Sequence, residues 1–257
     1  MLAAGATMWC SLLLLLSLSA HAESTPAPRP AASLSWSLSV DGSHVGYREV
    51  TVHWDDADTR VFEAWTTLSG RRLKGADRRL RYAQRVTANS HEGRPASFHS
   101  TWERREGTHD IQARRTGTTW KVTVAEGDDA RTHTLPHTRV DLSSIDLLDP
   151  ASERTLLGRT HARVLLAESG KIEEGPVRSL GRQELEVGGE ILQVDAVEWA
   201  TSQGVYRFWY ATNGWLVRWE APLFGLPVTA ELRGEAPRSA DEFPVAVNPA
   251  AIEVVDL

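Results

Sequence analysis

The sequence predicts an all-β fold, a curved antiparallel meander or half-open barrel with a short helical insertion near residues 143–157. Apolar and polar residues alternate along most of the chain, which is the period of a half-buried strand. Turn-forming Gly, Asn and Asp residues separate these runs. Helical periodicity is missing between the strands, so we expect no parallel crossover connections.

The first expected strand begins at Ser33 and alternates serines with the apolar residues Leu34, Trp36, Leu38 and Val40. Asp41-Gly42 supplies the turn that follows. The next segment carries two apolar sets of opposite parity, Val45 and Tyr47 in one and Val50, Val52 and Trp54 in the other. Because a strand keeps one parity unless an extra residue intervenes, we expect a β-bulge near Arg48–Glu49.

Further strands follow with the same alternation and are joined by polar turns. Their expected faces hold Phe62, Ala64 and Thr66; Leu80, Tyr82, Val86 and Ala88; Ala96, Phe98 and Trp102; and Ile111, Ala113, Trp120, Val122 and Val124. Consecutive strands of this kind pair as antiparallel neighbours, so this part of the domain should be a meander.

The segment 141–157 breaks the pattern, because its sequence fits short helical turns. Asp149 can cap a helix there, and Pro150 can take its first position. The same segment holds the most enzyme-like cluster of the chain, Asp146 and Asp149 with Ser143 and Ser144. Paired carboxylates can do acid–base work, but we favour capping as the role of these residues.

The first of two hairpins with a predicted register occupies residues 184–193. Two glycines at its centre suit a two-residue turn. That turn places Leu185 opposite Leu192 and Glu184 opposite Gln193.

The second hairpin occupies residues 205–220 and contains Asn213-Gly214, which predicts a two-residue type I′ turn. This turn gives the pairs Arg207 with Glu220, Trp209 with Arg218, and Phe208 with Trp219. One face then carries Tyr206, Phe208, Tyr210, Trp215, Val217 and Trp219. Core packing is the interpretation we favour for most of this face, and the wall of a cavity for an apolar ligand is the alternative. The five aromatic residues of the face are therefore the candidate ligand-binding residues.

The start of the chain predicts export. An apolar run over residues 9–20 leads into Ala20-His21-Ala22, a small-x-small cleavage site. We expect a signal peptide over 1–22, a Pro-rich disordered tether over 23–32, and a single β-rich domain over 33–257. The run is shorter than the roughly 20 residues that span a bilayer, and no other segment comes close, so no transmembrane helix is expected.

Composition excludes several classes of chemistry. Cys10 is the only cysteine and lies in the leader, so the mature chain has no disulfide, thiolate nucleophile or Cys-ligated zinc. The net charge of −6 disfavours a nucleic-acid partner, and the basic cluster at 71–81 is interpreted as a solvated surface. No nucleophile elbow, phosphate loop or dinucleotide fingerprint is present, so we expect no enzyme and no cofactor.

We also expect no metal. His133 and His137 have zinc spacing only on a helix, and Pro136 argues for extended chain. His91, His99 and His109 could converge across strands, but so could almost any three residues. The acidic groups lack the glycine and distal glutamate of a calcium loop; they are Asp55, Asp56 and Asp58, and Glu126, Asp128 and Asp129.

Two passages carry a family resemblance. Residues 40–47, with the pattern D-G-x-x-V-G, resemble the opening strand of exported bacterial β proteins grouped as domains of unknown function. Residues 208–217 resemble their W-Y-x-x-x-G-x-L hairpin, and 180–189 resemble the strand before it. The resemblance implies a periplasmic, strongly curved antiparallel sheet or open barrel, with no established activity.

The function these observations favour is that of an exported, non-catalytic protein of the bacterial envelope that binds a lipid or other apolar ligand. Its location would be periplasmic or extracellular. One alternative is a protein–protein interaction module of the envelope, which would show an exposed apolar strip. A further alternative is an exported hydrolase using Asp146 and Asp149, which would need these carboxylates and a histidine in a cleft.

The leader gives the first testable prediction. Because cleavage follows a small-x-small site, the exported protein should begin at Glu23. Intact-mass analysis of protein recovered from the periplasm or medium measures this directly. Protein that keeps Met1 and stays in the cytoplasm would contradict the localisation.

Overall fold

The computed structural model describes residues 32–55, 59–70, 81–91, 94–104, 107–149, 155–223 and 225–233. The N-terminal half holds β1 (Ala32–Val40), β2 (Ser43–Trp54), β3 (Thr59–Ser69), β4 (Arg81–His91), β5 (Arg94–Arg104), β6 (Gly107–Thr116), β7 (Thr119–Glu126) and β8 (Asp129–Pro136). A 3₁₀ turn, η3 (His137–Arg139), leads to β9 (Leu142–Ser143) and the helix α1 (Ser144–Leu148). The C-terminal half holds β10 (His161–Leu165), β11 (Ile172–Val187), β12 (Glu190–Thr201), β13 (Gly204–Ala211), β14 (Leu216–Leu223) and β15 (Leu226–Leu232).

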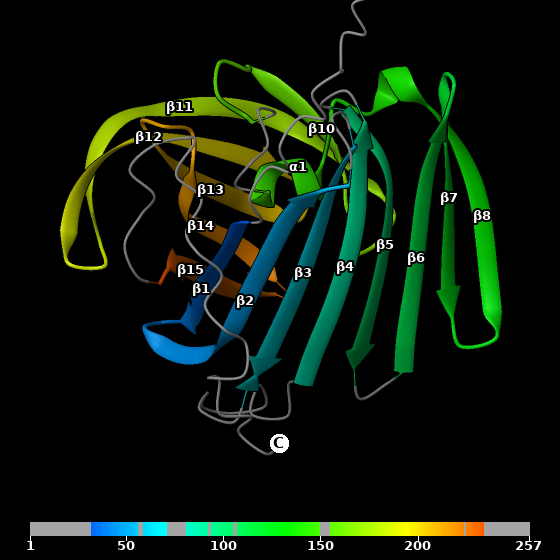
Figure 1. Cartoon of the computed structure of the whole chain (residues 1–257), viewed down its shortest axis with the longest axis horizontal. Coiled ribbons are helices and arrows are strands. Elements are labelled where there is room, and N and C mark those ends of the chain that lie inside the picture. Colours follow the sequence, from blue (N-terminus) through cyan, green and yellow to red (C-terminus); the bar gives the residue numbers. More distant parts are fainter. Residues whose placement is uncertain are drawn as a thin grey trace, which may run out of the picture.

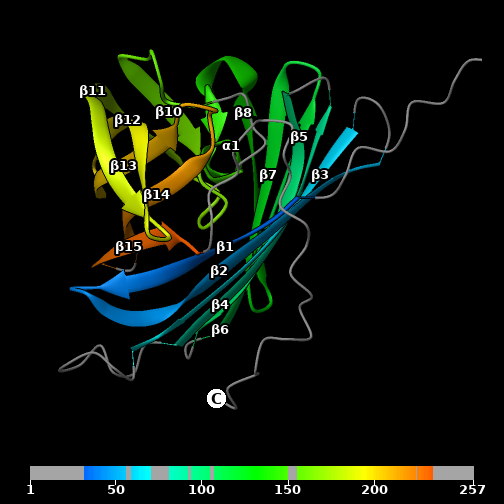
Figure 2. The ribbon, with the colours of Figure 1, turned by 60° about the vertical axis from the view of Figure 1, so that its left-hand side comes forward.

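All these strands form one 15-stranded sheet in the order β8-β7-β6-β5-β4-β3-β2-β1-β15-β14-β13-β12-β11-β10-β9. Strands β1 and β15 pair antiparallel and join the two halves, while β8 and β9 are the two free edges. The sheet curls around α1 without closing, and α1 lies inside the curve (Figure 1, Figure 2). The predicted all-β, half-open architecture with a short helix is therefore confirmed. The expectation of no parallel connection is wrong at one place, because β9 and β10 pair in parallel with α1 between them in the chain.

The hydrophobic core lies on the inner face of the curve. The inward residues of each strand follow the alternation seen in the sequence, so successive strands bury Trp36, Val50, Phe62, Val86, Phe98, Ile111 and Val122. The C-terminal half adds Val197, Trp199, Phe208, Val217 and Trp219 to the same cluster. Helix α1 contributes Ile145 and Leu147, which fill space that a curved sheet cannot fill by itself.

The register of β1 and β2 corrects one prediction. Asp41 and Gly42 form the expected turn, with φ values of 47° and 74°. The irregularity, however, lies beside this turn, where Leu38 pairs with Gly46 and Ser39 with His44, so that Val45 is the extra residue. The predicted bulge near Arg48–Glu49 is wrong.

Gly46 supplies the physical reason for this register. A Cβ atom at Gly46 would lie 1.9 Å from the backbone oxygen of Thr67, so β2 and β3 approach closely there. With the bulge at Val45, β2 keeps one parity from Gly46 to Trp54. Arg48 therefore shares the inner face with Val50, and Tyr47 is on the outer face.

The hairpin of β11 and β12 has the predicted register. Leu185 pairs with Leu192 and Glu184 with Gln193. The Gln193 side-chain amide donates a hydrogen bond to Glu184 Oε1 at 2.9 Å. Gly188 and Gly189 both have positive φ, as a two-residue hairpin turn requires.

The hairpin of β13 and β14 has the three predicted pairs, but its turn differs. Gly214 N–H donates to the Ala211 carbonyl, and Ala211 N–H donates to the Trp215 carbonyl, both at 2.8 Å. Gly214 has a φ of 85°, whereas Asn213 does not have positive φ. The turn is a three-residue loop with Gly at the left-handed position, not type I′, and Asn213 Oδ1 accepts from Trp215 N–H at 3.2 Å. A register shift between Trp209 and Tyr210 restores the three predicted pairs.

Helix α1 also begins earlier than the capping prediction placed it. Ser143 is its N-cap, and Asp146 completes a capping box with it. Asp149 is the C-cap of α1, and the helix start predicted directly after it falls on residues that the structure does not describe. The reciprocal Ser143–Asp146 bonds are short-range and satisfy the first turn without Asp149. Pro150 lies outside the described residues.

Several sequence expectations fall on parts of the chain that the structure does not describe. They concern the leader, the tether, most of the basic cluster at 71–81 and the tail after residue 233. Within the described ranges, no helix combines the length and the apolar character needed to cross a membrane.

The loop at Gly214 gives the second prediction. Replacing Gly214 with Val should lower the free energy of unfolding by about 1–3 kcal/mol, because a β-branched residue is strained at a φ of 85°. Gly214→Asn is the matched control and should cost less, since Asn tolerates the left-handed region. Urea denaturation measures both, and equal midpoints for wild type and the Val variant would contradict the loop conformation.

Candidate functional site

A cavity of about 660 Å³ lies inside the curve of the sheet, and we call it the central cavity. Its walls come from the inner faces of both halves, from α1 and from the loop between β10 and β11. This volume is within the range of small-molecule sites, roughly 300–1,000 Å³. A second pocket, beside α1, holds only about 20 Å³.

The C-terminal half supplies an aromatic wall. Of the candidate ligand-binding residues, Tyr206, Phe208 and Trp219 line the central cavity. Tyr210 and Trp215 are buried but lie outside its lining, so they belong to the core. Sequence reasoning did not identify Trp199, which is fully buried on β12 and adds its ring to this wall.

The phenol of Tyr206 is a hydrogen-bond donor at neutral pH. Its ring packs against Trp199 with centroids 4.9 Å apart. Burial, with smaller effects from the Glu168 and Glu173 carboxylates, raises the pKa of Tyr206 to about 12. Burial also raises the pKa of Tyr210. Both hydroxyls therefore stay protonated.

The N-terminal half supplies a polar wall, because one line of paired residues crosses its inner face. Starting at β2 and ending at β8, each member pairs with the next across the sheet. We call this line the transverse row; its members are Arg48, Thr66, Gln84, Trp102, His109, Glu126 and Asp129, and all line the central cavity.

Exposure rises along the transverse row. Arg48 is 3 % exposed and Gln84 2 %, whereas the side chains of His109 and Glu126 are 21 % and 67 % exposed. The row thus runs from a buried cation near the β1–β15 seam to exposed carboxylates at the free edge of the sheet. Exposed Arg131 and His133 from β8 also line the outer end, which makes the mouth of the cavity polar.

Most members of the transverse row have protein partners. The Gln84 amide donates to Ser100 Oγ at 2.8 Å, and the Trp102 indole N–H donates to the Glu168 backbone oxygen at 3.0 Å. His109 stacks on Trp102 with centroids 3.6 Å apart, and its Nδ1 lies 3.2 Å from Glu126 Oε1. These contacts hold in place the side chains in the middle of the transverse row and near its exposed end.

Arg48 differs from these neighbours. Its Nε is buried without a hydrogen-bond partner, and its guanidinium makes no ion pair with any described residue. Burial lowers the pKa of Arg48, and the Glu168 carboxylate opposes this shift from a distance. Glu168 is itself engaged, since it accepts a hydrogen bond from Ser144 Oγ at 3.3 Å.

Three further buried donors without a partner in the described structure belong to residues that line the cavity. They are Thr66 Oγ1 beside Arg48 and the indole N–H groups of Trp199 and Trp219. A buried donor without an acceptor costs about 1–3 kcal/mol, so such a grouping is a feature of function more than of stability. The cavity wall is therefore rich in donors.

The Asp146–Asp149 cluster lies elsewhere, beneath α1. Asp146 Oδ2 accepts from the Ser143 N–H at 2.7 Å and from its hydroxyl at 2.9 Å. Asp149 Oδ2 is 2.7 Å from Arg60, and both side chains are buried. The adjoining pocket holds only about 20 Å³, space for about one water, and no histidine lines it. Both carboxylates thus make structural bonds.

The histidines do not converge. His99 lies on the outer face, where Nε2 is 2.6 Å from Asp110 Oδ2, while His109 faces the cavity. The side chain of His91 lies outside the described residues. Among the side chains that the structure does describe, no three His, Cys, Asp or Glu residues are placed to hold a metal ion.

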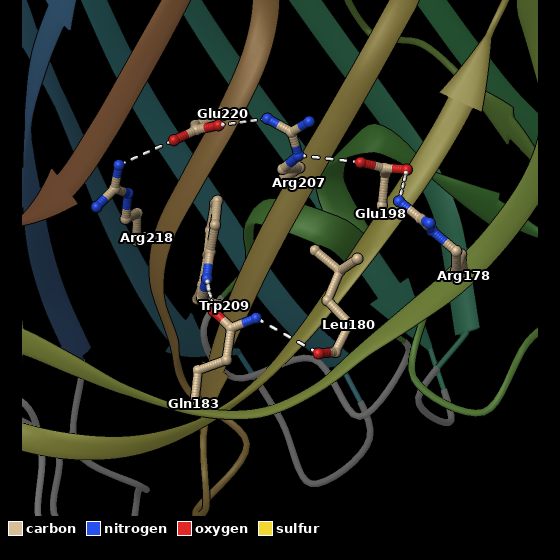
Figure 3. A network of polar contacts seen from close by, with 8 residues as sticks. All are labelled: Arg178, Leu180, Gln183, Glu198, Arg207, Trp209, Arg218 and Glu220. Carbon is tan, nitrogen blue, oxygen red and sulfur yellow. Dashed lines mark hydrogen bonds and ion pairs between the residues drawn. The ribbon is translucent and has the colours of Figure 1, made fainter.

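The outer face of the C-terminal half carries an ionic network (Figure 3). Glu198 accepts from Arg178 at 2.8 Å and from Arg207 at 3.0 Å, and Glu220 joins Arg207 to Arg218. Burial alone would raise the pKa of Glu198, but the bonds from the two arginines outweigh it and lower that pKa. Arginines on this face are thus paired with carboxylates.

The fold has a counterpart among solved structures. The chain is similar to a β-barrel-like protein of a domain of unknown function, DUF1849, from Brucella abortus, with a TM-score of 0.54. The match covers 81 % of this chain and 98 % of that chain at 11 % sequence identity, so the likeness concerns the fold alone. No family model matches the chain, and no curated protein matches it in sequence.

The ion pair of Asp149 gives the third prediction. Asp149→Asn should lower the free energy of unfolding by about 3–5 kcal/mol, because it removes the carboxylate that lies 2.7 Å from the buried Arg60 guanidinium. Asp195→Asn is the matched control; its pair with Arg182 is exposed, so it should cost less than about 1 kcal/mol. Denaturation midpoints measure both. A fully stable Asp149→Asn variant would show that the carboxylate has no structural role.

Proposed function

We propose that this protein is an exported, non-catalytic component of the bacterial envelope that binds a lipid or other apolar ligand in the central cavity. The observation that carries the proposal is the cavity of about 660 Å³ with its wall of Trp199, Tyr206, Phe208 and Trp219. Aromatic rings offer large apolar areas to a ligand, and concave apolar sites with a few polar groups are typical binding sites.

Two further observations support binding over catalysis. The only paired carboxylates singled out from the sequence, Asp146 and Asp149, are held in bonds to Ser143 and Arg60. The central cavity combines apolar rings and hydrogen-bond donors with carboxylates, among them Glu126 and Asp129 at its exposed end, and this mixture suits recognition of an amphiphile. Export is supported by the apolar run and the small-x-small site at the start of the chain.

An uncharged probe tests the proposal. N-phenyl-1-naphthylamine fluoresces when it leaves water, so saturable enhancement with the wild-type protein would show an apolar site. Trp219→Ala should weaken the probe's affinity by about tenfold, or about 1.4 kcal/mol, because Trp219 lines the cavity. It should also cost less stability than the roughly 3–5 kcal/mol of a core aromatic truncation, since one side of its ring faces the cavity.

Trp120→Ala is the matched control. Trp120 is as buried as Trp219 but packs on Phe98 away from the cavity, so its loss should lower stability and leave probe affinity unchanged. Absence of saturable binding by the wild type would overturn the proposal. The envelope interaction module would then become the favoured function.

A further inference from the structure

We propose that Arg48 is the anchor for an oxyanion headgroup, a carboxylate or phosphate, of an amphiphile whose apolar part occupies the central cavity. This inference rests on the proposed function, since it names the class of ligand for the same site. It is carried by the burial of Arg48, its lack of a counterion and the donors around it.

Burying a charge without a counterion costs free energy. A guanidinium taken out of water loses hydration free energy that a counterion normally restores. Arg48 is 3 % exposed, and its Nε has no hydrogen-bond partner. Replacing buried charged groups by apolar groups of similar size is often neutral or stabilising, so the presence of Arg48 points to a charge that arrives from outside.

The other buried arginine and the arginines of the outer network have carboxylate partners. Arg60, the other buried arginine of the described chain, lies 2.7 Å from Asp149. The arginines of the outer network also contact carboxylates (Figure 3). These arginines thus lie beside carboxylates, whereas the buried arginine that lines the cavity, Arg48, has none at contact distance.

Glu168 does not take that place. Its carboxylate affects Arg48 only from a distance and is bonded to the Ser144 hydroxyl. A guanidinium has five N–H donors in a planar fork that fits two oxyanion oxygens at once. A distant carboxylate leaves that fork available and helps to keep it charged.

Further hydrogen-bond donors belong to residues that line the cavity together with Arg48. Thr66 is its neighbour across β2 and β3, and its hydroxyl also lacks a partner. The indole N–H groups of Trp199 and Trp219 add donors from the opposite wall. Every one of these groups can donate, so the complementary ligand is one rich in acceptors, such as an oxyanion.

Apolar side chains also line the cavity. Tyr82, Trp102, Leu147 and Phe208 line the same cavity and offer apolar surface. A free inorganic anion would leave this surface in contact with water, whereas an amphiphile would cover it while its headgroup meets Arg48. The arrangement therefore fits a single-chain anionic amphiphile.

The test compares dansyl-undecanoate with its uncharged methyl ester on the full mature protein. The wild type should bind the carboxylate about tenfold tighter or more, the range of one charge-assisted hydrogen bond. Arg48→Met should lower carboxylate affinity to that of the ester and leave ester affinity unchanged. Arg48→Lys should keep part of the preference, because it retains the charge but loses the planar fork.

Arg182→Met is the matched control, since Arg182 is paired with Asp195 on the exposed outer face and should leave both affinities unchanged. Unfolding of the Arg48→Met variant is a second readout: its denaturation midpoint should equal or exceed that of wild type, because an unpaired charge is removed. A large fall in this midpoint, or an unchanged preference for the carboxylate, would overturn the anchor.

The remaining arms separate the possible failures. Equal wild-type affinity for the carboxylate and the ester overturns the anchor while the proposed function stands. Binding of neither probe overturns both. Displacement of dansyl-undecanoate by decyl phosphate and not by inorganic phosphate supports an amphiphile, whereas displacement by inorganic phosphate overturns that assignment.

Discussion

The structure depends on the pairing of β1 with β15. Apart from the parallel β9–β10 pair, each half of the sheet is built from antiparallel pairs of strands that are neighbours in sequence, and such pairs need only short loops to close. The β1–β15 ladder instead joins Trp36 to Leu232 and Leu38 to Ala230, residues from opposite ends of the described chain. Closing so long a loop costs entropy that grows slowly with length, so a short ladder with buried side chains suffices. Because this ladder makes one sheet of two meanders, their apolar faces curve toward each other and enclose the central cavity.

The curvature explains why the inner face is graded from apolar to polar. Near the seam the two walls are close, and inward residues such as Trp36 and Leu38 are completely packed. Toward β8 the walls diverge and the sheet ends at a free edge, so inward positions there are solvated and carry Glu126 and Asp129. Arg48 breaks the gradient, because it is a charged residue on the packed side. A fold selected only for stability would place an aliphatic side chain at this position.

Sequence patterns predicted those parts of the fold that depend on residues close together in the chain. They failed where the structure depends on contacts between residues far apart in the chain. Period-two alternation identified the meander, and turn glycines gave the register of β11 with β12, because both depend on residues close in sequence. The β1–β15 pairing has no local signal. The parity conflict in β2 was detected but placed at Arg48–Glu49, since nothing in the sequence shows that Gly46 packs on the Thr67 backbone. That misplacement hid the key site residue. Parity with Val50 and Val52 was the signal that could have revealed Arg48 as inward.

Arginine has different roles on the two faces of the sheet. On the outer face, guanidinium groups such as Arg207 bridge Glu198 and Glu220 in a solvated network, where each pair contributes little and its loss costs little (Figure 3). On the inner face, the position of Arg48 along β2 places its side chain among packed neighbours. Any charge interaction is stronger in this low-dielectric environment. A preorganised cation of this kind needs no rearrangement to meet an oxyanion. On binding of the proposed oxyanion, the stability lost by burying the charge in the free protein would be recovered, and affinity for an anionic headgroup would be coupled to the stability of the whole sheet.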